Sequence, residues 1–498
     1  MTKKEEMKTL YILSALGVIA LLAEIFKFKK FLLPLVLIGL LGAIAAAIKD
    51  WNTNIHYYSN MMSFDNYAIL FTIVLCSIAF LWFLTSQGFF RSESSKSDHY
   101  ALVLFSLCGA MLMVSYSNMV MLFLGIEILS IPIYVLAGSN KDSLASNESA
   151  LKYFLMGAFA TGFLLFGIAM IYGATGSFDI GSIGTMLKSP ELISVWRGPG
   201  GETLLYVGIL LMLIGLCFKV AAAPFHFWTP DVYEGAPTPV TAWMSTLVKT
   251  AAFAAFLRLF MTCFAQTGSV WMNIIWIMAA LTILLGNITA VYQNSVKRML
   301  AYSSISHAGY MLLAIISMNE HSAGSVLFYS AAYSVATISA FAVLSIVESE
   351  TPRPEGSQGN APSPFRAGVI DSFIGLSKRN PLLAFAMTIS MLSLAGIPPL
   401  AGFFGKYYLF TSALQNGYVW LVLIAALGSL IGVYYYFRVI IAMYSTPSSV
   451  SPQGGETKAS HPSPLGGELE WGAKLALLLC ILLSLLLGCF PDMIIRLI

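Results

Sequence analysis

Long apolar stretches follow one another along nearly the whole of this 498-residue chain. A helix needs roughly 20 apolar residues to span the hydrocarbon core of a bilayer. Fourteen candidate spans can be read from the sequence, at residues 8–26, 31–48, 66–86, 101–115, 117–138, 150–173, 203–223, 237–262, 271–291, 299–318, 323–348, 381–413, 417–442 and 473–491. The sequence therefore predicts an all-α, polytopic membrane protein of about 14 transmembrane helices.

The composition supports this class and excludes several others. Charged residues make up 10% of the chain and apolar residues 58%, whereas a soluble domain has about 25% and 45–50%. A net charge of +3 spread over 498 residues gives no basic surface for nucleic acid. We therefore exclude a soluble globular protein, a disordered chain and a nucleic-acid-binding protein.

No residue pattern indicates a cofactor held by this chain. The six cysteines are scattered and no two have C-x-x-C spacing, which argues against an iron–sulfur cluster, a zinc site or a disulfide framework. The histidines do not face one another on successive spans as haem ligands do. No glycine-rich phosphate-binding motif follows a strand-like run. We expect the chain to work without a cofactor of its own.

Two groups of five consecutive spans show a weak internal similarity. Spans four to eight and nine to thirteen each contain an odd number of helices, so the two groups enter the membrane from opposite sides. Inverted repeats of this kind are common in ion-translocating proteins. The chain is thus predicted to contain an N-terminal three-helix segment (1–100), two five-helix repeats (101–262 and 271–442) and a linker with the last helix (443–498).

The fourth helix of each predicted repeat is interrupted beside a lysine. Span seven ends in Lys219-Val-Ala-Ala-Ala-Pro224, and span twelve contains Pro398-Pro399 upstream of Lys406. Proline removes a backbone hydrogen bond and breaks a helix. Broken backbone is tolerated at membrane depth only where protein buries it or where water reaches it. Two lysines at matching places in broken helices 7 and 12 are the strongest internal indication of function.

Four charged residues lie deep within apolar spans, namely Glu127, Lys219, Lys249 and Lys406. A charge at the bilayer centre costs at least about 2.5–3.5 kcal/mol on insertion scales. A charge pair that ties helices together is one explanation, but three lysines face one glutamate, and apolar packing often holds helices as well. The second explanation, which we favour, is a proton relay. Desolvation favours neutral lysine and a nearby carboxylate favours charged lysine, so a changing Glu127 contact would switch Lys219 between the two forms.

Lys152 and His307 are secondary candidates. Lys152 begins span six, where it either reaches toward the membrane surface or contacts Glu127 across a helix pair. His307 lies early in an apolar span among serines, where it is either a hydrogen-bonded structural residue or a proton carrier. Asp231 and Glu234, in the proline-rich stretch after the first break, are expected to be structural.

Basic residues outside the spans predict the orientation of the chain. They are more frequent in the odd-numbered loops than in the even-numbered loops and the termini together, which places the odd loops in the cytoplasm and both termini outside. The basic N-terminal tail favours the opposite orientation. Arg258 and Arg438 lie near helix ends and are expected to extend toward the membrane surface. Residues 348–366 and 446–470 are rich in Pro, Gly and Ser and are expected to be flexible linkers.

Several of these segments resemble one known family. The run from Lys219 to Pro239 is similar to the signature of the antiporter-like subunits of respiratory complex I, with relatives in sodium/proton antiporter complexes and membrane-bound hydrogenases. Four other segments match in the family's order: Gly-Ile-Glu127-Ile-Leu-Ser, the helix around Lys249, Ala-Tyr302-Ser-Ser-Ile-Ser-His307, and Gly-Ile-Pro398-Pro399 with Gly405-Lys406. The resemblance covers about residues 8–491.

The resemblance implies a particular branch of that family and a particular set of functional residues. The segments around Glu127 and Lys152 look like the N-type subunit, whereas M-type subunits usually carry glutamate at the position of Lys406. By this resemblance the relay consists of Glu127, Lys219, Lys249 and Lys406, with Lys152 and His307 as accessories.

The resemblance also implies a setting and partners. The chain is expected to translocate protons in a bacterial inner membrane as a subunit of an NADH:quinone oxidoreductase. NADH, FMN, iron–sulfur clusters and quinone are expected on partner subunits. Lipid, the antiporter-like subunit M and small membrane subunits are the expected neighbours. The alternatives are a subunit of a sodium/proton antiporter or membrane-bound hydrogenase complex and, less compatible with the buried charges, a structural scaffold.

Overall fold

The computed structural model describes residues 7–90, 96–188, 200–350, 368–446 and 470–495. These residues are almost entirely helical, which confirms the predicted fold class. They also contain a short antiparallel hairpin, β1 (Ile55–Tyr57) and β2 (Met62–Phe64), that the sequence did not predict. Most of the two expected linkers, 348–366 and 446–470, lies outside the described residues.

Within the described ranges, thirteen helical segments are long and apolar enough to cross a membrane. They are built from α1 (Lys8–Ile25), η1 (Lys29–Phe31) with α2 (Leu32–Lys49), α3 (Asn66–Thr85), α4 (Lys96–Ser115), α5 (Met119–Ala137), α6 (Leu144–Thr175), α9 (Gly201–Val220), α11 (Thr238–Trp243) with η3 (Met244–Val248) and α12 (Lys249–Thr262), η4 (Ala265–Thr267) with α13 (Gly268–Val291), α14 (Val296–Ser317), α15 (Ser322–Glu350), α19 (Val419–Tyr444) and α20 (Trp471–Cys489). The remaining predicted span is split into α17 (Pro381–Ala395) and α18 (Ala401–Gln415), each too short to cross alone.

Short helices connect several of these spans. They are η2 (Gln87–Phe90), α7 (Ile180–Met186), α10 (Trp228–Gly235), η5 (Ile370–Phe373) and α16 (Leu376–Arg379), and a further short helix, α21 (Asp492–Ile495), follows the last span. Some membrane helices also extend beyond the spans predicted from the sequence. One example is α6, which begins at Leu144, whereas the predicted span begins at 150. The Ser143 hydroxyl accepts the backbone N–H of Ser146 and caps this helix, so polar residues that hydropathy misses belong to it.

Two helices are interrupted where the sequence predicted breaks 7 and 12. The first, α9, ends at Val220, and Ala221 takes a left-handed conformation (φ 62°) before the chain continues into α10. The second, α17, ends at Ala395, and Gly396 has φ +86°. Only glycine adopts this φ readily, and a Cβ on Gly396 would lie 3.0 Å from the Lys406 side chain. The predicted breaks are therefore confirmed, whereas the inverted relation of the two repeats and their boundaries stay predictions.

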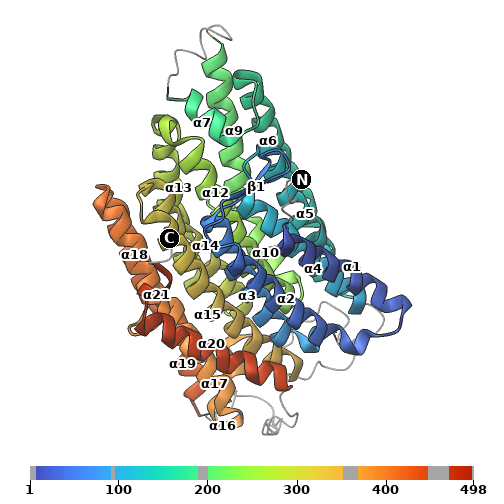
Figure 1. Ribbon diagram of the computed structural model, residues 1–498. Coiled ribbons are helices and arrows are strands. Elements are labelled where there is room, and N and C mark those ends of the chain that lie inside the picture. The colour runs from blue at the N-terminus through green and yellow to red at the C-terminus, as the bar shows by residue number, and fades with distance from the viewer. Residues whose placement is uncertain (1–6, 91–95, 189–199, 351–367, 447–469, 496–498) are drawn as a thin grey trace.

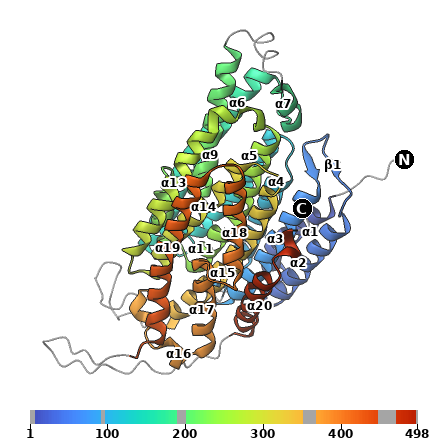
Figure 2. The same ribbon diagram turned by 90° about the vertical axis from the view of Figure 1, so that its left-hand side faces the viewer.

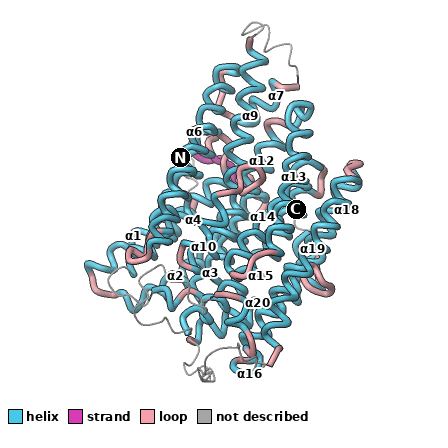
Figure 3. The backbone as a smooth tube through the Cα atoms, turned by 180° about the vertical axis from the view of Figure 1, so that it is seen from behind, coloured by secondary structure: helices cyan, strands magenta, loops and turns pink. Residues whose placement is uncertain are grey.

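The central elements of the molecule are α11–η3–α12, α14 and α15. In their most apolar 18-residue stretches, 100%, 94% and 89% of the residues are buried, against 33% for α1 and for η1–α2. In Figures 1 and 2 the helices α6, α7 and α9 lie at one end of the elongated molecule and α16 and α17 at the other. The view from behind in Figure 3 shows the same order. A helix buried on all sides belongs to a protein core, so polar residues on the central elements face protein rather than lipid.

Candidate functional site

Lys219 lies in the last turn of α9, immediately before the first break, and is only 7% exposed. Its Nζ donates a hydrogen bond to the Ser130 hydroxyl of α5. Glu127 is three residues before Ser130 and so lies on the same face of α5. No ion pair within 4 Å joins Glu127 to any cation among the described residues. The structure therefore places Glu127 on the face of α5 whose Ser130 bonds Lys219, while a functional Glu127–Lys219 pair stays a prediction.

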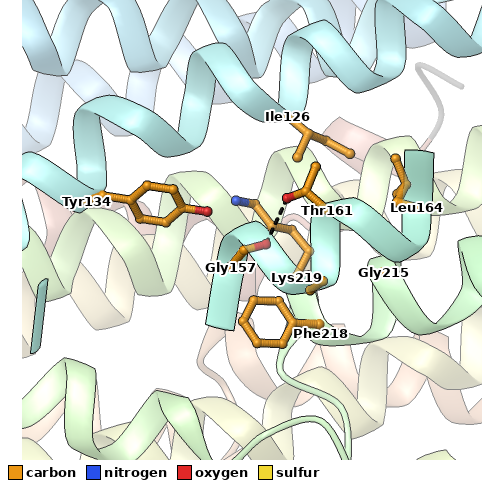
Figure 4. Close-up of a pocket in the computed structure, with 9 residues that line it drawn as sticks. Ile126, Tyr134, Gly157, Thr161, Leu164, Gly215, Phe218 and Lys219 are labelled. Carbon is orange, nitrogen blue, oxygen red and sulfur yellow. Dashed lines mark hydrogen bonds between the residues drawn. The ribbon is translucent and has the colours of Figure 1, made fainter. Parts of the chain in front are cut away.

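A small pocket surrounds the Lys219 side chain. Residues of α5, α6 and α9 line it, and Figure 4 shows the Lys219 amino group and the Tyr134 hydroxyl pointing toward each other. Gly157 of α6 makes room for this arrangement, because a Cβ at that position would lie 2.2 Å from the Tyr134 oxygen. The hydroxyls of Tyr134 and Thr161 give the pocket polar groups beside the lysine.

Lys152 lies at the end of α6 near α10, and the expected alternative of a contact with Glu127 is wrong. Its Nζ is 2.6 Å from Glu148 and 2.8 Å from Asp231, and its side chain is 39% exposed. Arg298 of α14 pairs with the same Asp231 and with Glu234. These contacts join α6, α10 and α14, as expected for structural roles of Asp231 and Glu234.

The ion pairs of α10 set the titration of Asp231. Burial raises the pKa of this carboxyl, but the hydrogen bond from Lys152 and the charges of Lys152 and Arg298 outweigh that effect. The pKa of Asp231 is therefore held below its usual range, and the carboxylate is charged at neutral pH.

Lys249 is the first residue of α12 and is 2% exposed. It follows the π-helical turn η3, a departure from α-helical geometry that is frequent at functional sites. Its Nζ donates to both the backbone carbonyl and the hydroxyl of Ser304 on α14. The charge that the sequence placed deep in span eight is therefore fully enclosed by protein oxygen atoms and apolar side chains.

His307 lies on α14 one turn after Ser304, and both of its ring nitrogens are hydrogen-bonded. Nδ1 is 2.6 Å from the Tyr329 hydroxyl of α15, and Nε2 is 3.0 Å from the Tyr436 hydroxyl of α19. Tyr436 in turn bonds the Ser303 hydroxyl. A neutral imidazole donates from one nitrogen and accepts at the other, so either tautomer fits between the two phenols.

Lys406 of α18 is 6% exposed and lies beside the second break. Its Nζ donates to the carbonyls of Leu394 (3.0 Å) and Ala395 (2.9 Å) and to the Ser429 hydroxyl of α19 (2.9 Å). It also lies 5.2 Å from the centre of the Tyr310 ring. The two carbonyls end α17, and a cation at a helix C-terminus is stabilised by the helix dipole.

A second small pocket lies between His307 and the break that holds Lys406. Tyr329, Ala332, Tyr333, Ser393, Leu394 and Gly402 complete its lining. Leu394 supplies both a wall of this pocket and a carbonyl for Lys406. The structure thus brings Lys249, His307 and Lys406 into one polar region around α14. Lys219 lines a separate pocket between α5, α6 and α9, and Glu127 is on α5 beside Ile126 of that lining.

Sequence reasoning missed the hydroxyl partners of these residues. Ser130, Ser429, Tyr329 and Tyr436 carry no signal in the sequence, since similar residues occur throughout the spans. For Ser304 the sequence indicates only that it is one of the serines near His307. Arg258 also differs from its prediction: it is 8% exposed and pairs with Asp65 at 2.6 Å instead of extending to the surface. The described residues contain no group of three or more His, Cys, Asp or Glu side chains arranged to hold a metal ion.

The fold and this site define a polytopic helical membrane protein whose buried lysines lie at irregular points of its spans. The family model for the transmembrane region described as "NADH:quinone oxidoreductase/Mrp antiporter" matches residues 116–432. The chain belongs to this family. That membership confirms the resemblance found in the sequence.

Relatives and solved structures agree with this assignment. The chain is 43% identical to NADH-quinone oxidoreductase subunit N of Cytophaga hutchinsonii, with 98% of this chain and 99% of the relative covered. It is 40% identical to the subunit of the same name from Flavobacterium psychrophilum, covering 99% and 100%. A chain of respiratory complex I from Thermus thermophilus superimposes with a TM-score of 0.76 at 34% identity, covering 98% of each chain. A chain of the Mrp complex from a Dietzia species shares the fold (TM-score 0.81, 20% identity, 99% and 96% covered).

Proposed function

We propose that this chain translocates protons across a bacterial inner membrane as a membrane-arm subunit of an NADH:quinone oxidoreductase. One observation carries the proposal. Lys219, Lys249 and Lys406 have no carboxylate within 4 Å among the described residues, and they are buried within membrane-spanning segments or beside the second break and hydrogen-bonded to neutral oxygens. A charge placed this deep in a membrane costs free energy. Proton transfer along these groups would explain why the chain contains them.

The proposed path has two parts. Glu127 and Lys219 form the first, where the carboxylate favours the protonated lysine and a weakened contact releases the proton. Lys249, His307 and Lys406 form the second, connected through hydroxyls of α14, α15 and α19. The pocket near His307 offers polar groups that could hold water between these stations. Lys152 is an accessory at the α6–α10 end rather than a partner of Glu127.

The setting is part of the same proposal. NADH, FMN, iron–sulfur clusters and quinone bind to partner subunits, and this chain contributes proton transfer without a redox group. Its neighbours in the membrane are an antiporter-like subunit M and small membrane subunits. Both termini lie on the periplasmic side, and residues 101–262 and 271–442 form inverted repeats, each with one broken helix.

The test uses inverted membrane vesicles that carry the whole complex. Lys219→Ala is expected to lower NADH-driven proton pumping and NADH:quinone activity together by at least about tenfold, because a positioned proton-transfer group contributes about 10²–10⁴-fold. Assembly is checked on a native gel. Lys141→Ala, which changes an exposed loop lysine, is the matched control and should leave both activities unchanged.

The same vesicles distinguish the alternative of an antiporter subunit. If assembled Lys219→Ala complex retains both activities at wild-type level, the relay proposal fails. If the chain is found in a complex that exchanges sodium for protons without NADH oxidation, the family membership holds but the proposed redox partner is wrong.

A further inference from the structure

A serine hydroxyl accompanies each of the three proposed relay lysines, whereas the fourth buried lysine of the described residues, Lys297 at the start of α14, donates to the Ala236 carbonyl. Lys219 donates to Ser130, Lys249 donates to Ser304, and Lys406 donates to Ser429. In each pair the serine lies on a different helix from the lysine, namely α5, α14 and α19. Such recurrence at three separate stations shows a common type of contact and not an incidental packing arrangement.

A hydroxyl is suited to a partner that changes its charge. Protonated lysine has three N–H donors and no acceptor, whereas the neutral amine gains a lone pair that accepts a hydrogen bond. A carboxylate or a backbone carbonyl only accepts. A serine hydroxyl accepts from the ammonium and donates to the amine, so it stays bonded in both states. An unmatched buried polar group costs about 1–3 kcal/mol. Because the hydroxyl bonds the lysine in both the protonated and the neutral state, neither state bears this cost.

Two of the serines also have a backbone carbonyl to which the hydroxyl can donate while it accepts a hydrogen bond from the lysine. The Ser130 hydroxyl donates to the Ile126 carbonyl one turn earlier in α5. The Ser429 hydroxyl is oriented to donate to the Ala395 carbonyl, 3.5 Å away. While the lysine is charged, the hydroxyl hydrogen thus points at a carbonyl and an oxygen lone pair faces the lysine. After the proton leaves, rotation about the C–O bond turns the hydrogen toward the amine nitrogen.

We propose that Ser130, Ser304 and Ser429 are positioning residues whose hydroxyls keep the relay lysines hydrogen-bonded in both the protonated and the neutral state. This inference rests on the proposed function, because it gives the serines a role in proton transfer through Lys219, Lys249 and Lys406. No proton passes covalently through the serine in this scheme. The lysine gives and receives the proton, and the hydroxyl only reverses the direction of its own hydrogen bond.

The experiment compares Ser130→Thr with Ser130→Val in inverted vesicles. Threonine and valine have nearly the same shape, and they differ by a hydroxyl in place of a methyl group. Because both substitutions add the same branch to α5, any effect of crowding is shared by the pair. We expect the threonine variant to pump at least about fivefold faster than the valine variant, as loss of one hydrogen bond to a charged group predicts. The pairs Ser304→Thr with Ser304→Val and Ser429→Thr with Ser429→Val should show the same order.

Ser115 supplies the matched control. It is fully buried in α4 and its hydroxyl donates to the Met111 carbonyl one turn earlier, as that of Ser130 does to Ile126, but it bonds no lysine. Ser115→Thr and Ser115→Val should therefore pump equally well.

Lys219→Ala, measured alongside, separates the two proposals. Equal activities of the Ser130 threonine and valine variants, with Lys219→Ala inactive, would overturn the role of the serine and leave the relay intact. An active Lys219→Ala would overturn the relay itself.

Discussion

The two lysines at the broken helices occupy matching places in the sequence but have different surroundings. Lys219 precedes its break and reaches sideways to Ser130 of another helix, with Glu127 nearby. Lys406 follows its break and reaches back to two carbonyls at the end of α17. The first lysine therefore has a carboxylate on the facing helix, whereas the second is bonded to backbone dipoles.

The segments that follow the breaks differ in the same way. After the first break, α10 is held by ion pairs from Asp231 and Glu234 to Lys152 and Arg298, and these side chains are at least 30% exposed. After the second break, α18 is held to α17 by the buried Lys406 itself. Lys406 is therefore both a candidate proton carrier and a structural connection, whereas at the first break these two roles belong to different residues.

The largest expected effect follows from the double role of Lys406. Lys406→Ala should abolish NADH-driven proton pumping and also lower the thermal stability of the assembled complex. The Leu394 carbonyl loses its lysine donor, at about 1–3 kcal/mol for an unmatched buried group, and the Ala395 carbonyl keeps only the longer contact from the Ser429 hydroxyl. Lys219→Ala should abolish pumping with little loss of stability, because Ser130 still donates to Ile126.

The two variants are compared by the proton gradient in vesicles and by the thermal midpoint of the purified complex. Lys474→Ala, which removes an exposed lysine of α20, is the control for both measurements. Equal destabilisation by Lys219→Ala and Lys406→Ala would show that the two sites are held alike and that the comparison is wrong.

A smaller effect is expected when the carboxylate near the first lysine is neutralised. Glu127→Gln keeps the shape of the side chain but removes its charge, so that Lys219 loses the interaction that favours its protonated form. We expect proton pumping to fall about 3- to 10-fold, less than in Lys219→Ala, with assembly unchanged on a native gel. If Glu127→Gln is as inactive as Lys219→Ala, the carboxylate carries the proton itself and does not merely tune the lysine.

The contrast between the two breaks also shows how much of the site could be predicted. Proline and glycine within apolar runs identify broken helices, and lysine within an apolar run stands out against its surroundings. Glu127, Lys219, Lys249 and Lys406 could therefore be singled out from local sequence. The three lysines are buried and Glu127 is partly buried, all within membrane-spanning segments or beside the second break, while their roles in proton transfer stay a proposal.

The partners of these residues could not be predicted, because each contact joins helices far apart in the sequence. Ser130 is 89 residues from Lys219, and Tyr436 is 129 residues from His307. Arg258 is predicted to extend toward the membrane surface, but it is buried and pairs with Asp65, which is 193 residues away in the sequence. For Lys152 the sequence suggests Glu127 as one possible partner, whereas in the fold its amino group bonds Asp231. Apolar patterns determine which segments are helices and contain little information on which helices become neighbours.

The smallest expected effect concerns acid sensitivity of the two segments that follow the breaks. The pKa of Asp231 is held below its usual value of 3.8 by Lys152 and Arg298. A carboxyl with a lowered pKa contributes stability at neutral pH that is lost as the pH falls through its folded-state value. Because these ion pairs are partly exposed, the contribution is about 0–1 kcal/mol. Between about pH 5 and pH 3, α10 should therefore loosen, whereas α18, which Lys406 holds to neutral carbonyls, should not.

Hydrogen exchange of the assembled complex, corrected for the intrinsic pH dependence of exchange, measures this difference at the amides of α10 and α18. Asp231→Asn removes one titrating group but keeps its size, so α10 should exchange faster at neutral pH. It should also gain less further speed in acid than the wild type, because only the Glu234–Arg298 ion pair remains. Asp142→Asn, in an exposed loop, is the control and should exchange like the wild type. Equal acid sensitivity of α10 and α18 in the wild type would contradict the assignment of ion pairs to one break and carbonyl contacts to the other. Loss of protection in α10 alone would show that the segment after the first break, near Lys219, opens more easily than α18. This is the result expected if the Glu127–Lys219 interaction changes during proton transfer.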